Sequence, residues 1–361
     1  MERVLIYGMS SNMGGIETYL LNLYDRIHGK QFMIDFVSDF PEIAEEDILK
    51  AKGSSVFHIP AKGKGLLAHW KALMSILKAH PEYKSVYFNI LDAGAVFTII
   101  VPFLLRRRVV VHSHNGSTDK IRLHKFCRPI LNMCTSARVA CSREAGYYMF
   151  GKNGSDALVI PNAIDAAKYT FNADIRSEKR KKLALENKLI ICHVGRLSRQ
   201  KNPFFLLDIF EALHKKCPDS VLVSVGTGEL EREFNSYLRN KGLAECVKCL
   251  GMRPDVPELL QAADVFLFPS LYEGLSIAML EAQAAGLPCV VSDTIVDSTI
   301  VTADVVKVSL KASLDIWVNK IIEAAKVDRK DTYIDICTAG FDISCVNGYD
   351  EKLLKLWSGG K

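Results

Sequence analysis

The sequence predicts an α/β fold made of two doubly wound, parallel-sheet domains that face each other across a cleft. Short, almost wholly apolar segments alternate with amphipathic segments along nearly the whole chain. Parallel strands that helices cover on both faces have this pattern. The alternation is interrupted once, near residue 163. The length of 361 residues also favours two domains, because it exceeds what one hydrophobic core usually supports.

The first domain is expected over residues 1–162. Amphipathic helices are predicted at 15–29 and 66–80, between strands of four to six residues. The predicted strands lie within 3–8, 33–38, 55–60, 85–90, 108–113, 137–142 and 157–162.

The second domain is expected over residues 163–342. It opens with a polar, charge-rich stretch at 163–188, which predicts a linker and a short helix. Helices are predicted from Pro203, from about Glu229, before 264 and after 273, and an amphipathic helix is predicted in the tail. The predicted strands lie within 188–195, 220–226, 246–251, 264–270 and 288–293.

The composition excludes several classes of protein. No apolar run approaches the roughly 18 residues of a membrane span, and MERVLIYGM is too short and too quickly polar for a signal peptide. The ten cysteines are scattered, and the pair Cys246 and Cys249 has no second pair at zinc-finger spacing. We therefore expect reduced thiols, no metal site and a cytoplasmic location.

Positive charge is concentrated in the first domain. Residues 1–162 carry 20 Lys or Arg against 14 Asp or Glu, whereas 163–361 carry 26 against 27. One interpretation is that these residues form a solvated surface. The other is that they attract a phosphate-bearing acceptor or anionic lipid, and the protein would then contact the inner membrane face peripherally. Nucleic acid is not expected, because no aromatic residues are interleaved for stacking. The basic residues include Arg106, Arg107, Arg108, Lys120, Arg122, Lys125 and Arg128.

The strongest functional indication is EGLSIAMLE at 273–281, between an expected strand and an expected helix. Glu273 is predicted at the mouth of this turn, beside the unpaired N–H groups of the helix start, and Glu281 about a turn and a half into the helix. A helix N-terminus binds phosphate, and a neighbouring carboxylate suits sugar or ribose hydroxyls. One turn is therefore suited to both halves of a sugar nucleotide.

A second loop, HVGRLSRQKNP at 193–203, follows the first strand of the second domain. Gly195 permits a tight exit from that strand, and Asn202 with Pro203 predicts a helix start that the Asn202 side chain caps. Arg196 and Lys201 would stand in front of this helix, where two cations stabilise a leaving diphosphate. Alone they are equally well explained as exposed loop cations; beside the Glu273 turn, the diphosphate role is favoured.

His112 and His114 close an expected strand and lie two positions apart, so they point to the same side. A single histidine at a strand end is usually structural. Here Asn115 follows at the expected cleft edge, and substrate contact is predicted for His114, with His112 and Asn115 as further candidates. A metal site would need a third ligand, which the sequence does not offer.

Glycines mark two further loops. Gly14 and Gly15 follow the first strand and allow a ligand to approach the backbone, although a plain strand-to-helix turn explains them nearly as well. Their spacing does not match G-x-G-x-x-G, so a nicotinamide cofactor is not expected. Gly226 and Gly228 are best explained by a turn. Arg253, in the loop before strand 264–270, is a candidate for contact with the base.

Together these motifs resemble the retaining glycosyltransferases that have two glutamates with seven residues between them (family 4 type, GT-B fold). The resemblance covers nearly the whole chain, and HSHN at 112–115 is similar to members that build bacterial capsule and exopolysaccharide. Ser276 and Ala163 depart from the family pattern, in which glycine is usual. The motifs are GGIE at 14–17, VIPNAID at 159–165, GRLSRQKN at 195–202, VGTGEL at 225–230 and EGLSIAMLE at 273–281.

The resemblance implies a role for each matching residue. Glu281 would hold the ribose hydroxyls and Glu273 would lie near the anomeric centre. Arg196 and Lys201 would neutralise the diphosphate, so no cofactor and no divalent metal is expected. The final helix, within 343–361, would cross back onto the first domain. Further contacts are implied for Gly14, Gly15, His114, Asn162, Arg253, Gly274, Leu275 and Ser276.

The expected reaction is transfer of a hexose or N-acetylhexosamine, with retention, from a nucleotide-diphosphate sugar to a saccharide or lipid-linked saccharide. UDP is the expected nucleotide. Two alternatives remain open: a sugar-nucleotide 2-epimerase of the same fold, and a non-catalytic subunit that binds a sugar nucleotide. An epimerase would need no acceptor and would need acid–base carboxylates around C2 and C3, for which the sequence offers no independent set. The intact set Arg196, Lys201, Glu273 and Glu281 argues against a non-catalytic subunit.

Overall fold

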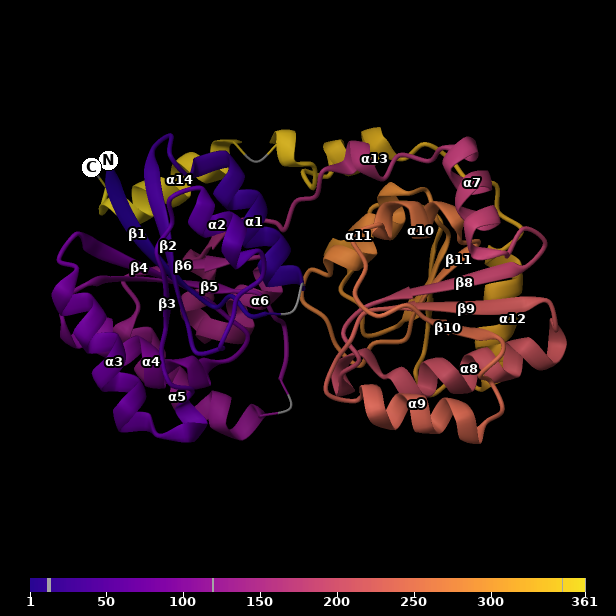
Figure 1. Ribbon diagram of the computed structural model, residues 1–361, viewed down its shortest axis with the longest axis horizontal. Coiled ribbons are helices and arrows are strands. Elements are labelled where there is room, and N and C mark those ends of the chain that lie inside the picture. Colours follow the sequence, from indigo (N-terminus) through magenta and orange to yellow (C-terminus); the bar gives the residue numbers. More distant parts are fainter. Residues whose placement is uncertain (12–13, 119, 346, 361) are drawn as a thin grey trace. The chain divides into compact units, whose positions relative to one another are not determined.

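The computed structural model describes residues 1–11, 14–118, 120–345 and 347–360, and the chain divides into two compact units (Figure 1). Unit 1 comprises Met1–Asn162 and Val346–Lys361, and unit 2 comprises Ala163–Cys345. Each unit has one parallel sheet with helices on both faces (Figure 1). The two parallel-sheet domains predicted from the sequence are thereby confirmed.

The sheet of unit 1 has seven strands in the order β3-β2-β1-β4-β5-β6-β7, and every pair is parallel. All seven predicted strands form. They are β1 (Glu2–Tyr7), β2 (Phe32–Ser38), β3 (Val56–His58), β4 (Tyr83–Ile90), β5 (Arg108–Ser113), β6 (Ala137–Ala140) and β7 (Leu158–Val159).

Alternate residues of these strands enter two hydrophobic cores, one on each face. Val4 and Ile6 of β1 pack with the helices of one face, and Leu5 packs with those of the other. Helices α1 (Gly15–Ile27) and α14 (Asn347–Ser358) contribute to the first core. The remaining helices of unit 1 are α2 (Glu46–Ala51), α3 (Leu66–Ala79), α4 (Val96–Leu104), α5 (Ile121–Cys134) and α6 (Arg143–Phe150).

The C-terminal helix belongs to unit 1 although it is distant in sequence. Trp357 is 2% exposed, its carbonyl accepts from Ser85 Oγ, and its ring meets Phe32 edge-on. Arg26 donates to Asp350 at 2.6 Å. The predicted tail helix begins later than 343, because residues Ile343–Cys345 form a separate 3-10 turn in unit 2.

The sheet of unit 2 has six parallel strands in the order β10-β9-β8-β11-β12-β13. Five of them were predicted. The edge strand β13 was not, because its burial is only partial and its apolar run is interrupted by Lys307. The strands are β8 (Leu189–Val194), β9 (Ser220–Val225), β10 (Val247–Cys249), β11 (Val265–Phe268), β12 (Cys289–Ser292) and β13 (Val305–Val308).

The helices of unit 2 again cover both faces. Val265 and Leu267 of β11 enter one core, and Phe266 and Phe268 enter the other. The predicted linker helix is α7 (Ala173–Leu183), whereas α12 and α13 were not predicted. The other helices are α8 (Pro203–Lys216), α9 (Glu231–Asn240), α10 (Val256–Ala262), α11 (Ile277–Ala284), α12 (Leu314–Ala324) and α13 (Tyr333–Thr338).

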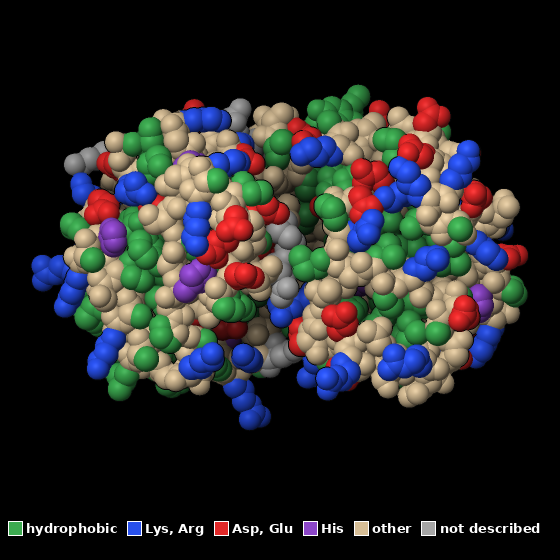
Figure 2. Space-filling view, viewed as in Figure 1, with side chains coloured by type: hydrophobic (Ala, Val, Ile, Leu, Met, Phe, Trp, Pro, Cys, Tyr) green, Lys and Arg blue, Asp and Glu red, His purple; other side chains and the backbone are tan. Residues whose placement is uncertain are grey.

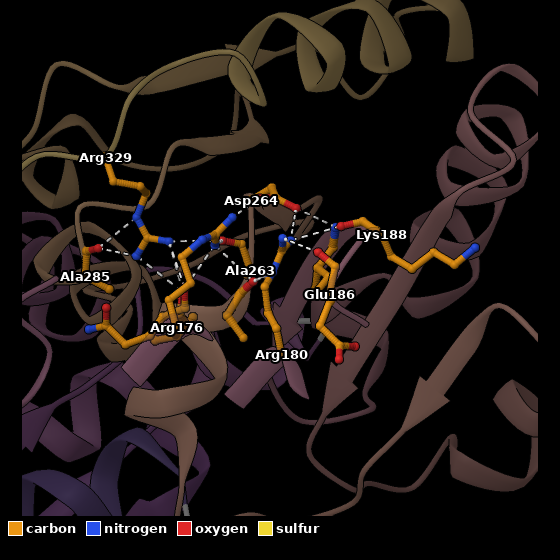
Figure 3. A network of polar contacts seen from close by, with 12 residues as sticks. Arg176, Arg180, Glu186, Lys188, Ala263, Asp264, Ala285 and Arg329 are labelled. Atoms are coloured by element: carbon orange, nitrogen blue, oxygen red, sulfur yellow. Dashed lines mark hydrogen bonds and ion pairs between the residues drawn. The ribbon is translucent and has the colours of Figure 1, made fainter. Parts of the chain in front are cut away.

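Three arginines hold the helix ends of unit 2 together (Figure 3). Arg176 and Arg180 both pair with Asp264, whose carboxylate also accepts the Ile190 N–H at 2.7 Å. Arg329 donates to the Ala285 carbonyl and to carbonyls at the end of α10. The last carbonyls of a helix have no partner within it, so these guanidinium groups cap α10 and α11.

The carboxyl ends of parallel strands meet at one edge of each sheet, and residues singled out in the sequence follow those ends. His114 does so after β5 in unit 1, and Gly195 and Glu273 do so after β8 and β11 in unit 2. Within the described ranges, no helix is long and apolar enough to cross a membrane.

Candidate functional site

In unit 2, the loop after β8 meets the turn after β11. Lys201 Nζ lies 2.7 Å from Glu273 Oε1, and the two side chains are 15% and 6% exposed. Gln200 donates to Glu273 Oε2 at 3.3 Å and to the Tyr272 carbonyl at 3.0 Å. The structure therefore brings Lys201 and Glu273, 72 positions apart, into one shielded ion pair.

Lys201 lies over the ring of Phe268, against which His193 is stacked. Its Nζ lies 4.6 Å from the centroid of the Phe268 ring, a distance at which a ring face attracts a cation. His193 is fully buried and donates from Nδ1 to the Leu267 carbonyl. Burial lowers the pKa of His193 to about 4, against the opposing effect of that hydrogen bond, and nearby Lys201 lowers it further.

The turn after Glu273 leads straight into α11. Gly274, Leu275 and Ser276 precede the helix, and the first helical hydrogen bond runs from Leu280 N–H to the Ser276 carbonyl. Ser276 takes the N-cap position, but its side chain makes no capping bond. The first-turn N–H groups consequently have no carbonyl one turn back, and such groups bind anions.

Glu281 has a different neighbour from Glu273. It is the fifth residue of α11, slightly nearer the helix start than predicted, and Tyr169 donates to its Oε1 at 2.7 Å. Burial raises the pKa of Glu281, while the Tyr169 hydrogen bond lowers it. The two carboxylates thus occupy separate surroundings, one beside a cation and one beside a phenol.

Two predicted cations lie on exposed loops. Arg196 pairs with Glu229 at 3.0 Å, with both side chains more than half exposed. Arg253 pairs with Asp255 at 2.7 Å. Neither recorded ion pair involves Glu273 or Lys201, so the structure groups only part of the predicted donor set.

The prediction that the Asn202 side chain caps α8 is wrong. Asn202 adopts the left-handed conformation (φ 54°, ψ 51°), and its side chain makes no capping bond. Its amide instead donates to the Pro269 carbonyl at 3.2 Å, which ties the loop to the end of β11. Pro203 does occupy the first turn of α8, as predicted.

The two glycines after β9 are required by packing. Gly226 has φ +122°, and a Cβ there would lie 2.2 Å from the Gly195 carbonyl oxygen. A Cβ on Gly228 would lie 2.3 Å from the Leu197 carbonyl oxygen. The predicted turn therefore also lets this loop pack closely against the loop that carries Arg196 and Lys201.

In unit 1, His112 and His114 lie on the same side of the strand end, as predicted, with ring centroids 3.9 Å apart. His114 Nε2 donates to Asn89 Oδ1 at 2.9 Å, and His112 Nδ1 lies 2.5 Å from the Tyr87 hydroxyl. Burial lowers the pKa of His114 to about 3, against the opposing contact of Asn162, so the ring is neutral at pH 7.

His112 is more deeply placed than His114. It is 0% exposed against 8% for His114, and burial and the neighbouring His114 hold its pKa well below the usual range. Its described contacts are those of a structural core histidine. Asn115 and Asn162 are also buried, and Asn115 accepts from the Gly116 N–H at 3.0 Å.

Helix α1 begins at the predicted glycine pair. Gly14 is extended at its N-cap and Gly15 is its first residue, whereas residues 12 and 13 of the same predicted loop lie outside the described residues. Glu17 accepts from Ser10 N–H and Oγ, and its Oε2 would lie 2.9 Å from a Cβ on Gly14. A carboxylate therefore stands beside this helix start, and this contact was not predicted.

Gln200, His193 and Tyr169 were not identified as site residues from the sequence, and they differ in whether a nearby motif could have pointed to them. Gln200 and His193 lie inside the motif already singled out, next to Lys201 and two before Gly195, so their proximity could have been inferred. Tyr169 lies in the linker, 112 positions from Glu281, and only the fold brings it there. In the described part of the chain, no three His, Cys, Asp or Glu side chains form a group that could hold a metal ion.

Comparison with known proteins identifies similar chains. A family model for glycosyl transferases group 1 matches residues 174–333. The chain is 31% identical over 344 residues to a protein of Bacillus subtilis (strain 168) that is named as the glycosyltransferase EpsF. The match covers 91% of this chain and 89% of that protein. An Escherichia coli protein named UDP-Gal:alpha-D-GlcNAc-diphosphoundecaprenol alpha-1,3-galactosyltransferase is 33% identical over 304 residues, across 78% of this chain and 76% of its own.

Solved structures share the fold. Anabaena Alr3699/HepE in complex with UDP-glucose has a TM-score of 0.82 at 22% identity, covering 98% of this chain and 100% of that one. Sucrose-phosphate synthase from Thermosynechococcus elongatus has a TM-score of 0.78 at 15% identity, covering 100% of both chains. The predicted fold class, two Rossmann-like domains of the GT-B type, is confirmed.

Proposed function

Because the chain belongs to the glycosyl transferases group 1 family, we propose that it transfers a hexose or N-acetylhexosamine from a UDP-sugar to a saccharide or lipid-linked saccharide. The reaction would proceed with retention at the anomeric carbon and without a metal ion. Its place would be the synthesis of a surface polysaccharide.

The shielded pair of Lys201 and Glu273 beside the start of α11 is the observation that carries this proposal. A leaving diphosphate gains negative charge as its bond to the sugar breaks. Lys201 and the first-turn N–H groups of α11 are two sources of positive potential within one unit. Glu273 supplies a carboxylate next to them for the sugar, and Glu281 would accept from the ribose hydroxyls.

In the proposed transfer with retention, one bond to the anomeric carbon breaks and one forms. The bond between the anomeric carbon and the diphosphate oxygen breaks, and the acceptor oxygen bonds to the same face of that carbon. The acceptor proton passes to the leaving diphosphate, which Lys201 and Arg196 stabilise. His114 is neutral, so we assign it a hydrogen-bonding contact with the donor sugar and no proton transfer.

The acceptor and nucleotide are proposed from the relatives. The E. coli relative is named for transfer from UDP-Gal to a diphosphoundecaprenol-linked sugar, and the Anabaena structure holds UDP-glucose. A lipid-linked acceptor is therefore the first class to assay, with UDP-glucose, UDP-galactose and their N-acetylated forms as donors.

The test has two stages. Thermal unfolding with each nucleotide sugar identifies the donor, because a ligand that binds only the folded state raises Tm by mass action. Transfer to short-chain lipid diphosphate sugars is then measured with and without EDTA, and the product anomer is assigned by NMR. Retained configuration and an unchanged rate in EDTA are expected; an inverted product or a rate restored only by a divalent metal would contradict the mechanism.

The same assay separates the alternative functions. Epimerase activity would convert the donor without an acceptor, and a non-catalytic subunit would bind the donor without any turnover. No described contact favours either alternative.

A further inference from the structure

A buried asparagine of β4, Asn89, lies beside the predicted site residue His114. Strands β4 and β5 are in register at Asn89 and His112, so the side chains of Asn89, His112 and His114 lie on the same side of the sheet. Asn89 is 2% exposed and His114 is 8% exposed. Surface histidines appear as separate purple patches in Figure 2, whereas His114 is largely enclosed within unit 1. A polar pair is therefore enclosed at the carboxyl ends of two neighbouring strands.

The exit of β1 makes room for Asn89 and orients its amide. Gly8 follows β1 with φ +123°, and a Cβ there would lie 2.2 Å from the Asn89 carbonyl oxygen and 2.9 Å from the Asn89 Cβ. Glycine therefore allows the two strand ends to approach closely. The Asn89 side chain donates from Nδ2 to the Tyr7 carbonyl at 3.4 Å. Because a carbonyl only accepts, this contact indicates which end of the amide carries the nitrogen.

The orientation of the amide determines which nitrogen of His114 carries a proton. With Nδ2 directed at Tyr7, Asn89 Oδ1 faces His114 Nε2 at 2.9 Å. An amide oxygen only accepts, so Nε2 carries the N–H. Burial lowers the pKa of His114 to about 3, and a neutral imidazole has a single N–H. Nδ1 therefore holds a lone pair and can only accept a hydrogen bond.

The ring of His114 is held in place, and its accepting nitrogen is enclosed. The ring centroid lies 3.9 Å from that of His112 and 5.2 Å from that of Tyr19. The Asn162 side chain also contacts His114 and opposes the lowering of its pKa. Among the described residues, no hydrogen bond reaches Nδ1. A buried acceptor without a hydrogen bond costs free energy, which a bound hydroxyl group would recover.

We propose that Asn89 is a positioning residue, which holds His114 as the Nε2–H tautomer so that Nδ1 accepts from a hydroxyl group of the donor sugar. This inference rests on the proposed function, in which His114 contacts that sugar. A site that bonds to a hydroxyl group rejects an analogue that lacks it, because the buried partner is then left unpaired. The donor would accordingly carry a free hydroxyl group at this contact, and not a deoxy position or a carboxylate.

NMR of protein labelled with ¹⁵N at histidine measures the tautomer directly, at neutral pH and without any substrate. The N–H nitrogen and the lone-pair nitrogen of a neutral imidazole differ widely in ¹⁵N chemical shift. His114→Gln identifies the signals of His114 by their loss. The result concerns the free protein alone, so it is independent of the proposed reaction.

Two other histidines of the chain serve as references for the two tautomers. A backbone N–H donates to Nδ1 of His124 at 3.1 Å, and its Nε2 donates to a backbone carbonyl at 3.0 Å, which fixes the Nε2–H form. His193 donates from Nδ1 to a backbone carbonyl at 3.0 Å, which fixes the Nδ1–H form. We expect the signals of His114 to match those of His124. A match to His193 would overturn the proposal and leave the proposed transferase function untouched.

Variants of Asn89 test whether it is the cause of the tautomer. Asn89→Leu keeps the side-chain size and removes the acceptor, and Asn89→Ala is a second variant in case the first does not fold. In both, a fraction of His114 should convert to the Nδ1–H form, because a buried N–H without an acceptor is costly. Tm values report whether each variant is folded. An unchanged tautomer in a folded Asn89 variant would overturn the role of Asn89.

Asn132→Leu is the matched control in the same unit. The Asn132 amide likewise donates to a backbone carbonyl, at 3.1 Å, and accepts from a side chain, at 3.2 Å. Its loss should leave the signals of His114 unchanged. Equal changes of tautomer in the Asn132 and Asn89 variants would show a general effect on unit 1 and would overturn the assignment to Asn89.

Binding of donor analogues tests the sugar contact separately. Isothermal titration compares UDP-glucose and UDP-galactose with their monodeoxy forms. In wild type, one deoxy position should raise Kd by about tenfold, and in Asn89→Leu the same position should raise it by less than about threefold. A penalty that is equal in both proteins would overturn the sugar contact. If neither UDP-sugar binds, the proposed function and the sugar contact both fail, while the tautomer measurement still decides the role of Asn89.

Discussion

Glu273 has two polar neighbours, Lys201 and Gln200, and both come from the loop that follows β8. The carboxylate thus neutralises the lysine. In the proposed reaction, the Lys201 ammonium would move toward the phosphate of the bound donor. Glu273 would then keep its hydrogen bond from the Gln200 amide and gain a contact with the sugar. At the residue scale, the proposed chemistry depends on this exchange of partners.

Replacement of Glu273 by Ala should lower kcat for transfer by about 1,000-fold, because a preorganised charge next to the reacting centre is lost. The donor Kd should stay within about threefold, since Lys201 and the start of α11 remain. Initial rates and isothermal titration with the donor measure the two quantities. Glu178→Ala, which breaks an exposed ion pair with Lys182 on α7, is the control and should leave kcat within about twofold. Full turnover in Glu273→Ala would refute the role of Glu273.

The donor KM should depend on the ionisation of Glu281. Burial raises the pKa of this carboxyl, so it becomes protonated at a higher pH than an ordinary glutamate. Only the ionised form accepts from both ribose hydroxyls. The KM should therefore rise as the pH falls, starting above the usual glutamate pKa of about 4.3, while kcat at saturating donor changes little.

Two variants check the origin of that pH dependence. Glu281→Gln should raise KM by roughly 10- to 100-fold and remove its pH dependence. Tyr169→Phe removes a hydrogen bond that lowers the pKa of Glu281, so the rise in KM should begin at a higher pH. A KM profile that is identical in wild type and Tyr169→Phe would contradict this account.

At the scale of single elements, helix ends decide much of the local geometry. The start of α8 is set by Pro203 and by the left-handed Asn202, which bonds to Pro269 instead of capping the helix. The ends of α10 and α11 are held by guanidinium groups from distant segments (Figure 3). Loss of such a cap leaves several carbonyls without a partner at once.

Arg329→Ala should therefore lower the free energy of unfolding of unit 2 by about 3 kcal/mol. Burial lowers the pKa of Arg329 to about 9, together with the neighbouring Arg176. The matched control is Lys330→Ala, because Lys330 is 65% exposed and lies 3.9 Å from Asp304; it should change stability by less than about 0.5 kcal/mol. Chemical denaturation followed by a probe in unit 2 measures the stability of both variants. Equal losses of stability would contradict the capping role of Arg329.

At the scale of the whole molecule, both units keep histidines buried and neutral. Burial lowers the pKa values of His114 to about 3 and of His193 to about 4, and holds that of His112 far below its usual value. The unfolded chain binds a proton at each of these positions below about pH 6.5, whereas the folded chain does not. The stability that these neutral histidines contribute is fully present above about pH 6.5. It is lost as the pH falls from there toward the pKa values that the histidines have in the folded chain.

Thermal unfolding from pH 7.5 to pH 4.5 should show this loss. Below about pH 6.5 each such histidine should remove about 1.4 kcal/mol of stability per pH unit. His193→Gln removes one titrating group and should make the decline shallower by that amount, whereas His80→Gln, at a more exposed position paired with Glu82, serves as the control. A stability that stays constant between pH 6.5 and pH 4.5 would contradict the role of histidine burial.

The fold was largely predictable because its signal is local. Continuous apolar strands and helical periodicity depend on near neighbours in the chain, so RVVVHS and LLAHWKALMSILKAH predicted β5 and α3 directly. The short, half-buried β13 has no such signal and was missed. The placement of His112 and His114 on one side also followed from the two-residue period of a strand.

The fold class, the strand ends at which the site residues lie and the resemblance to a glycosyltransferase family could all be inferred from the amino-acid sequence. Which of those residues meet could not. In the folded chain Lys201 pairs with Glu273, Tyr169 with Glu281 and Arg196 with Glu229, and the Asn202 amide bonds to Pro269. Backbone periodicity is set by residues a few positions apart, whereas side-chain pairing depends on how segments tens of residues apart pack together.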